Sequence, residues 1–132
     1  MYRWKEHTSE VQLELSASTA EGIFEEALAA VKELLADGST DESRELPRGI
    51  EIMAPDAAAL LVRWIDELTF IAEVEGLVPA VVLRIELADG ALRATVGFHA
   101  GAPRHLVKGT TYHGLSFGRH DHGWRATVVL DV

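Results

Sequence analysis

The C-terminal part of the chain reads LVKGTTYHGL at residues 106–115 and WRATVVLDV at residues 124–132. Both segments alternate β-branched, aromatic or apolar residues with polar ones, and they flank the polar segment Gly118–Gly123. The alternation predicts a β-hairpin with a turn of about six residues. We expect the rest of the chain to support this hairpin.

The last two residues of the sequence, Asp131 and Val132, bring two carboxylates together. As the sequence stands, the side-chain carboxylate of Asp131 and the α-carboxylate of Val132 belong to adjacent residues. Carboxylate oxygens are hard ligands of the kind that divalent cations prefer. This end of the hairpin is therefore the first candidate for a functional site.

The composition limits the class of protein. The 132 residues fit one domain spanning 1–132, and the chain is long enough to bury a hydrophobic core. A formal net charge of -9 argues against direct nucleic-acid binding, since phosphate contacts need a basic surface. The chain has no cysteine, which excludes disulfides and thiolate metal sites. No leader pattern or membrane-length apolar run is present, so we expect a cytoplasmic protein without membrane contact.

Two amphipathic helices are expected before the C-terminal hairpin. Ser18, followed three residues later by Glu21, predicts a capping box, and apolar residues then recur at helical spacing until about Asp37-Gly38. Asp56 is expected to cap a second helix from Ala57 to about Glu75, which Gly76 would end. Trp64 lies on the apolar face of this second helix and is expected in the core.

Alternating segments predict the remaining strands at residues 11–17, 48–53, 79–88 and 91–98. Asp89-Gly90 predicts a type I′ turn, and the acidic stretch 37–45 predicts a solvated connector. The order is then strand, helix, strand, helix and two hairpins. This order predicts an α+β fold, a two-layer sandwich of a mixed β-sheet with two amphipathic helices.

Three separated motifs resemble the archease family and together cover nearly the whole chain. They read HTSE at residues 7–10, LLVRWIDEL at 60–68, and VKGTTYH at 107–113 followed by Trp124 and the final Asp131-Val132. The family has His-Thr-Ala-Asp, then Leu-Leu-x-x-Trp-Leu-Asn-Glu-Leu, then Val-Lys-Ala-x-Thr-Tyr-His and a terminal Asp-Ile or Asp-Val. Each motif alone has little specificity, but the three in this order are specific.

The resemblance implies an accessory protein and not a free-standing enzyme. Archeases activate the RtcB-type RNA ligase that joins tRNA exons or repairs RNA, by promoting guanylylation of a ligase histidine and multiple turnover. Contact with tRNA and GTP would then be indirect, through the ligase. Carried over residue by residue, the family's metal ligands fall on Glu10, Asp131 and Val132, and its functional lysine falls on Lys108. The implied cofactor is a divalent cation, Ca²⁺, Mg²⁺ or Mn²⁺.

Two positions depart from the family pattern. Glu10 stands where the family has Asp, and Gln12 stands where glycine is usual. Glutamate offers the same carboxylate one methylene further from the backbone, which alters the geometry of an oxygen site. Octahedral Mg²⁺ tolerates such a change less well than Ca²⁺ does.

Other polar residues have both a functional and a structural interpretation. Lys108 could contact a partner or a phosphate, or it could be a solvated strand lysine. His113 and His7 could contact the same partner, or they could be partly buried histidines bonded to backbone. His120 and His122 resemble a metal-ligand pair, but a solvated turn is the interpretation we favour.

The working hypothesis is that the C-terminal tip docks at the ligase active site and places a carboxylate-held cation near the nucleotide phosphates. Two rival functions stay open. A small stand-alone metallohydrolase would turn over phosphoesters by itself and lose this activity on chelation. A chaperone-like or scaffolding domain would bind no metal and would tolerate a tag fused after Val132.

Overall fold

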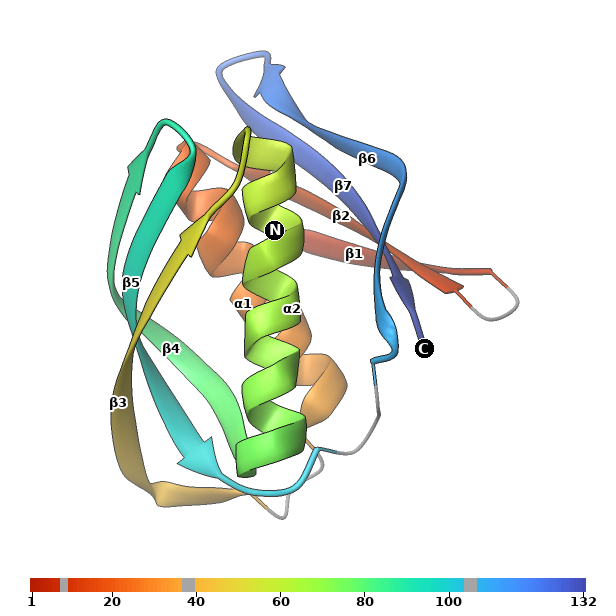
Figure 1. Cartoon of the computed structure of the whole chain (residues 1–132). Helices are drawn as coiled ribbons and strands as arrows, with labels where there is room; N and C mark the ends of the chain where they lie inside the picture. The colour runs from red at the N-terminus through yellow and green to blue at the C-terminus, as the bar shows by residue number, and fades with distance from the viewer. Residues whose placement is uncertain (8–9, 37–39, 104–106) are drawn as a thin grey trace.

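Two antiparallel sheets enclose two helices in the computed structural model, which describes residues 1–7, 10–36, 40–103 and 107–132 (Figure 1). Sheet A has the strand order β1-β2-β7-β6, made of β1 (Tyr2–His7), β2 (Glu10–Ala17), β7 (Gly123–Asp131) and β6 (Gly109–His120). Sheet B has the order β3-β5-β4, made of β3 (Asp41–Met53), β5 (Ala91–Ala100) and β4 (Leu77–Ala88). The helices are α1 (Ala20–Leu35) and α2 (Ala57–Glu75).

The α+β class with two amphipathic helices is confirmed, and the structure refines how its layers are arranged. Both helices lie between the sheets: α1 packs on β4 and β2, and α2 packs on β6, β4 and β3. Every strand pairing within the described residues is antiparallel, so neither sheet is mixed. Among the described residues, no helix is long and apolar enough to cross a membrane.

The predicted bounds of α2 are confirmed at both ends. Asp56 is the N-cap, with its Oδ1 accepting the backbone N–H of Ala59 at 2.8 Å. Gly76 ends the helix in the left-handed region at φ 67°, a conformation that costs glycine little because it has no Cβ. These two residues explain why the sequence pattern and the structure agree so closely.

The predicted capping of α1 is wrong. Thr19 and not Ser18 is the N-cap, and its Oγ1 accepts the N–H of Gly22 at 3.0 Å. The helix ends at Leu35 with Ala36 in an extended conformation. The expected stop at Asp37-Gly38 lies outside the described residues.

Several strands differ from the expectation. The segment 2–7, for which no element was predicted, forms β1, and β3 begins at Asp41, inside the predicted connector. The hairpin β6–β7 turns through two residues, Asp121 and His122, and not through six, because His120 already pairs with Gly123. The turn between β4 and β5 is not type I′, since Gly90 has a positive φ and Asp89 does not.

Trp64 joins the two helices at the centre of the core, as its place in the apolar stripe predicted. Its side chain is fully buried, and its Nε1 donates to the backbone carbonyl of Phe24 at 2.9 Å. The two rings meet edge to face at 6.3 Å between centroids. Phe117 and the half-buried Trp124 extend this aromatic contact into the last hairpin, with centroids 5.9 Å apart. The core thus fixes sheet A, which carries the candidate site, to both helices.

Candidate functional site

Strand register brings the predicted metal ligands of the N- and C-terminal segments together. Glu10, the first residue of β2, lies directly opposite Asp131, the last residue of β7. On the other side of β7, Asp131 lies opposite Gly109, the first residue of β6. The predicted ligands therefore share one end of sheet A although they are far apart in the sequence (Figure 1).

The two carboxylates are neighbours on one face of the sheet. Directly opposed residues of an antiparallel pair have Cβ atoms about 4.5–5.5 Å apart, which lets both side chains reach one cation. Glu10 and Asp131 are half-buried, and within the part of the chain that the structure describes neither carboxylate has a hydrogen-bond or ion-pair partner. Two like charges thus lie on directly opposed residues with no paired cation among the described side chains, and a divalent cation would relieve their repulsion.

Glu14 provides a contrast on the same face of β2. Its carboxylate has a cationic partner, since Lys5 Nζ lies 3.0 Å from Glu14 Oε1. The hydrogen-bonded ammonium of Lys5 lowers the pKa of the Glu14 carboxyl from its usual value, and the charge of Arg3 acts in the same direction. The pairing of Glu14 shows that β2 presents both compensated and uncompensated carboxylates outward.

Lys108 and Val132 lie beside this carboxylate pair. The backbone N–H of Lys108 donates to the carbonyl oxygen of Asp131 at 2.8 Å, and its side chain is exposed. The side chain of Val132 is half-buried and packs against the core. The core thereby anchors Val132, and Lys108 adds a positively charged ammonium group to the same end of the sheet.

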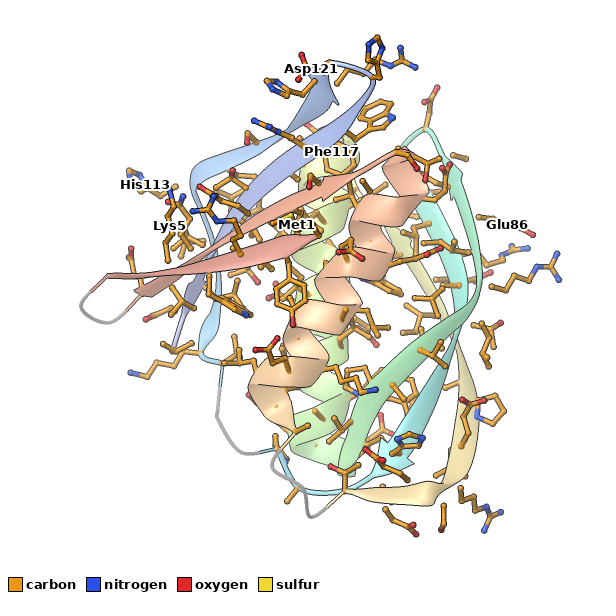
Figure 2. The ribbon with its side chains drawn as sticks, turned by 180° about the vertical axis from the view of Figure 1, so that it is seen from behind. Met1, Lys5, Glu86, His113, Phe117 and Asp121 are labelled. Atoms are coloured by element: carbon orange, nitrogen blue, oxygen red, sulfur yellow. The ribbon has the colours of Figure 1, made fainter. Side chains whose placement is uncertain are left out.

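The two predicted histidines occupy different places. His7 is the last residue of β1 and lies opposite Glu10 in the register. His113 lies further along β6, in the segment between Thr111 and Ser116 where the register shifts, and it is exposed. Figure 2 shows His113 and Lys5 pointing away from the helices on the outer side of sheet A. The interpretation of His113 as a partly buried histidine is therefore wrong.

The His120–His122 segment has the exposed character expected of a solvated turn. Both histidines are exposed, and His120 Nε2 lies 3.4 Å from Asp121 Oδ2. The described residues contain no group of three or more His, Asp or Glu side chains that could hold a metal ion. Any cation at Glu10 and Asp131 would therefore need further ligands, such as the Val132 α-carboxylate, water or a partner's phosphate.

Two acidic residues of α2 reach the start of β6, and sequence reasoning placed both only on the polar side of the helix. Glu73 Oε1 accepts the backbone N–H of Val107 at 3.0 Å. Asp66 Oδ1 accepts a hydrogen bond from the hydroxyl of Thr110. Their spacing of two helical turns was a signal of a shared partner on one side of the helix.

Comparison with known proteins gives a match over the whole chain. The model of the Archease protein family (MTH1598/TM1083) matches residues 2–132. The protein archease of Methanosarcina mazei is 28% identical over 140 residues, which cover 99% of this chain and 95% of that protein. The protein archease of Thermococcus gammatolerans is 30% identical over 143 residues, which cover 100% of both.

Two solved structures are similar in fold. Protein 1598 of Methanobacterium thermoautotrophicum superposes with a TM-score of 0.71 and 28% identity, covering 99% of this chain and 98% of that one. A protein of Thermotoga maritima, described as an archease and possible chaperone, superposes with a TM-score of 0.70 and covers 100% of this chain and 98% of that one. Its identity is 20%, so this second likeness concerns the fold alone.

Proposed function

Because this chain belongs to the archease family, we propose that it is a metal-binding accessory protein that activates an RtcB-type RNA ligase. It promotes guanylylation of the ligase and multiple turnover in tRNA splicing or RNA repair, in the cytoplasm. It meets tRNA and GTP only through the ligase. The observation that best supports this proposal is the direct opposition of Glu10 and Asp131 at one end of sheet A.

The donor set fits a hard divalent cation, Ca²⁺, Mg²⁺ or Mn²⁺. Glu10 and Asp131 would supply carboxylate oxygens, and the α-carboxylate of Val132 would supply a further one. Such a set leaves coordination positions open for water or phosphate oxygens, as is common for Mg²⁺ at nucleotide sites. When bound, the cation supplies positive charge that stabilises phosphates during nucleotidyl transfer.

Lys108 contributes a second positive charge at this end of sheet A. Its side chain is exposed, and its backbone is bonded to Asp131. An ammonium on a flexible stem can approach either a phosphate or a ligase carboxylate. In the proposed complex Lys108 orients the nucleotide phosphates or the ligase surface relative to the carboxylates.

Cation binding is tested by calorimetric titration of the purified protein with Ca²⁺, Mg²⁺ and Mn²⁺. We expect one site in the parent and a loss of affinity of about tenfold or more in Asp131→Ala and Glu10→Ala, since each removes a ligand. Glu14→Gln is the matched control, because it removes a carboxylate from the same face of β2 without touching the pair. Equal affinities of the parent and Asp131→Ala would refute the metal site.

Activation is tested with the RtcB-type ligase of the same source under single- and multiple-turnover conditions. The protein should raise multiple turnover and ligase guanylylation, and Asp131→Ala and Lys108→Ala should lower this gain. No gain in turnover with the parent protein would refute the proposal.

A chaperone-like role is the second candidate, because α2 exposes two apolar side chains. Phe70 is 54% exposed and Val74 is 64% exposed, one turn apart on the helix. Neighbouring exposed apolar groups can mark a surface that contacts a protein partner. This role needs no cation, so full activity of Asp131→Ala toward a partner would favour it.

A further inference from the structure

The chain that carries Lys108 is bonded to its surroundings on both sides. Glu73 of α2 accepts the N–H of Val107, which precedes Lys108. Asp66 of α2 accepts the hydroxyl of Thr110, which follows it. Between these two bonds, the N–H of Lys108 itself donates to the carbonyl of Asp131.

The spacing of the two carboxylates matches the spacing of the groups that they bind. Asp66 and Glu73 are separated by about 10.5 Å along the axis of α2, since each helical residue rises about 1.5 Å. Thr110 and Val107 are separated by about 10 Å of extended chain, at about 3.3 Å per residue. A shift of the segment 107–110 along α2 by one residue would therefore break both bonds together.

The hydrogen bond from Val107 to Glu73 matters because Val107 is buried. Val107 is 6% exposed, so without Glu73 its N–H would lose its partner in a largely buried place. An unpaired buried N–H is costly, and the local chain would move to reach water. The next residue is Lys108, whose own side chain has no bond or ion pair within the described residues. The backbone bonds are thus what fixes its position.

We propose that Glu73 and Asp66 are positioning residues, which hold Lys108 beside Asp131 by bonding the chain on either side of it to α2. Neither carboxylate belongs to the proposed metal site. The effect of these residues on the ligase rests on the proposed function, whereas their effect on the position of Lys108 does not.

The position of Lys108 is tested by amide hydrogen exchange, followed by NMR. In Glu73→Ala we expect the amide of Val107 to exchange about tenfold faster, because its charged acceptor is lost. The amide of Lys108 keeps its acceptor, the carbonyl of Asp131, but should also exchange faster because the chain before it is released. Glu73→Gln keeps an acceptor oxygen and should restore most of the protection. Asp66→Ala should also speed the exchange of these amides, because it removes the acceptor of the Thr110 hydroxyl. Thr110→Val, which removes the hydroxyl at nearly constant volume, should have the same effect.

The controls separate a local effect from general destabilisation. Glu25→Ala removes an exposed glutamate from α1 and should leave the amides of Val107 and Lys108 unchanged. Amides of the central strand β5 should keep their protection in all variants. Unchanged exchange at Val107 and Lys108 in both Glu73→Ala and Asp66→Ala would overturn the proposal.

The link to function is tested by a double-mutant cycle on ligase activation. We expect Glu73→Ala to lower the maximal stimulated turnover about as much as Lys108→Ala does. In the Lys108→Ala background it should add less than about a twofold further loss, because both act through one group. Fully additive losses would show that Glu73 does not act through Lys108. If the parent activates no ligase, the proposed function fails, and the exchange measurements still decide the positioning role.

Discussion

Glu10 and Glu14 lie on the same face of β2 and differ only in their neighbours. Glu14 is paired with Lys5, whereas Glu10 faces the carboxylate of Asp131. Position in the strand therefore does not decide which glutamate is available to a cation. The neighbouring strand decides it, because β1 offers an ammonium at one position and β7 offers a like charge at the other.

At this residue scale we expect Lys5→Met to raise the pKa of the Glu14 carboxyl toward its ordinary value. The folded pKa is now lowered, so the pair stabilises the fold above the ordinary value of 4.5, and this contribution is lost as the pH falls through the folded value. The pair is exposed, so the contribution is small and salt weakens it. NMR titration of Glu14 measures the change, with Lys32→Met as the control. An unaltered titration in Lys5→Met would contradict the assignment.

At the scale of elements, caps decided how well the helices could be predicted from the sequence. The bounds of α2 followed from Asp56, an unambiguous start signal, and Gly76, an unambiguous stop signal. For α1 the sequence offers two adjacent hydroxyl residues, Ser18 and Thr19, and only the backbone conformation selects between them. Local pattern alone therefore placed the N-cap one residue too early.

Substitution of the two hydroxyl residues distinguishes these alternatives. We expect Thr19→Ala to lower the free energy of unfolding by about 1 kcal/mol, since the N–H of Gly22 loses its acceptor. Ser18→Ala should change it by less than about 0.5 kcal/mol, as an exposed residue outside the helix. Urea unfolding of both variants measures the difference. The reverse order of effects would restore Ser18 as the cap.

The strand segments that the sequence did not predict carry either no apolar alternation or too short a stretch of it. Residues 41–45 of β3 are all exposed, so no alternation of apolar and polar residues marks them as a strand. In β1, Tyr2 and Trp4 do alternate with Arg3 and Lys5, but the segment is short. Both strands lie at sheet edges, where one neighbour strand suffices to hold them.

At the scale of the whole molecule, the candidate site depends on topology that no local pattern contains. The family resemblance predicted Glu10 and Asp131 as partners, but periodicity gave no reason to group them. Their meeting requires that β2 and β7, near opposite ends of the chain, pair in a register that puts the first residue of one against the last of the other. A shift of one residue would send one carboxylate to the opposite face of the sheet.

If Glu10 and Asp131 hold the proposed cation, the effect of Asp131→Asn on stability should have opposite signs in the absence and in the presence of that cation. Without cation, Asp131→Asn should raise the free energy of unfolding by about 0.5 kcal/mol, because it removes a like-charge pair. At a cation concentration of one hundred times Kd, the parent should gain about 2.7 kcal/mol and the variant much less. Urea unfolding in EDTA and in saturating Ca²⁺ or Mn²⁺ measures both effects, with Glu25→Gln as a control for charge removal elsewhere. If Asp131→Asn were less stable than the parent in EDTA, the two carboxylates would not repel each other. If the variant gained as much stability from the cation as the parent does, the two carboxylates would not bind one ion.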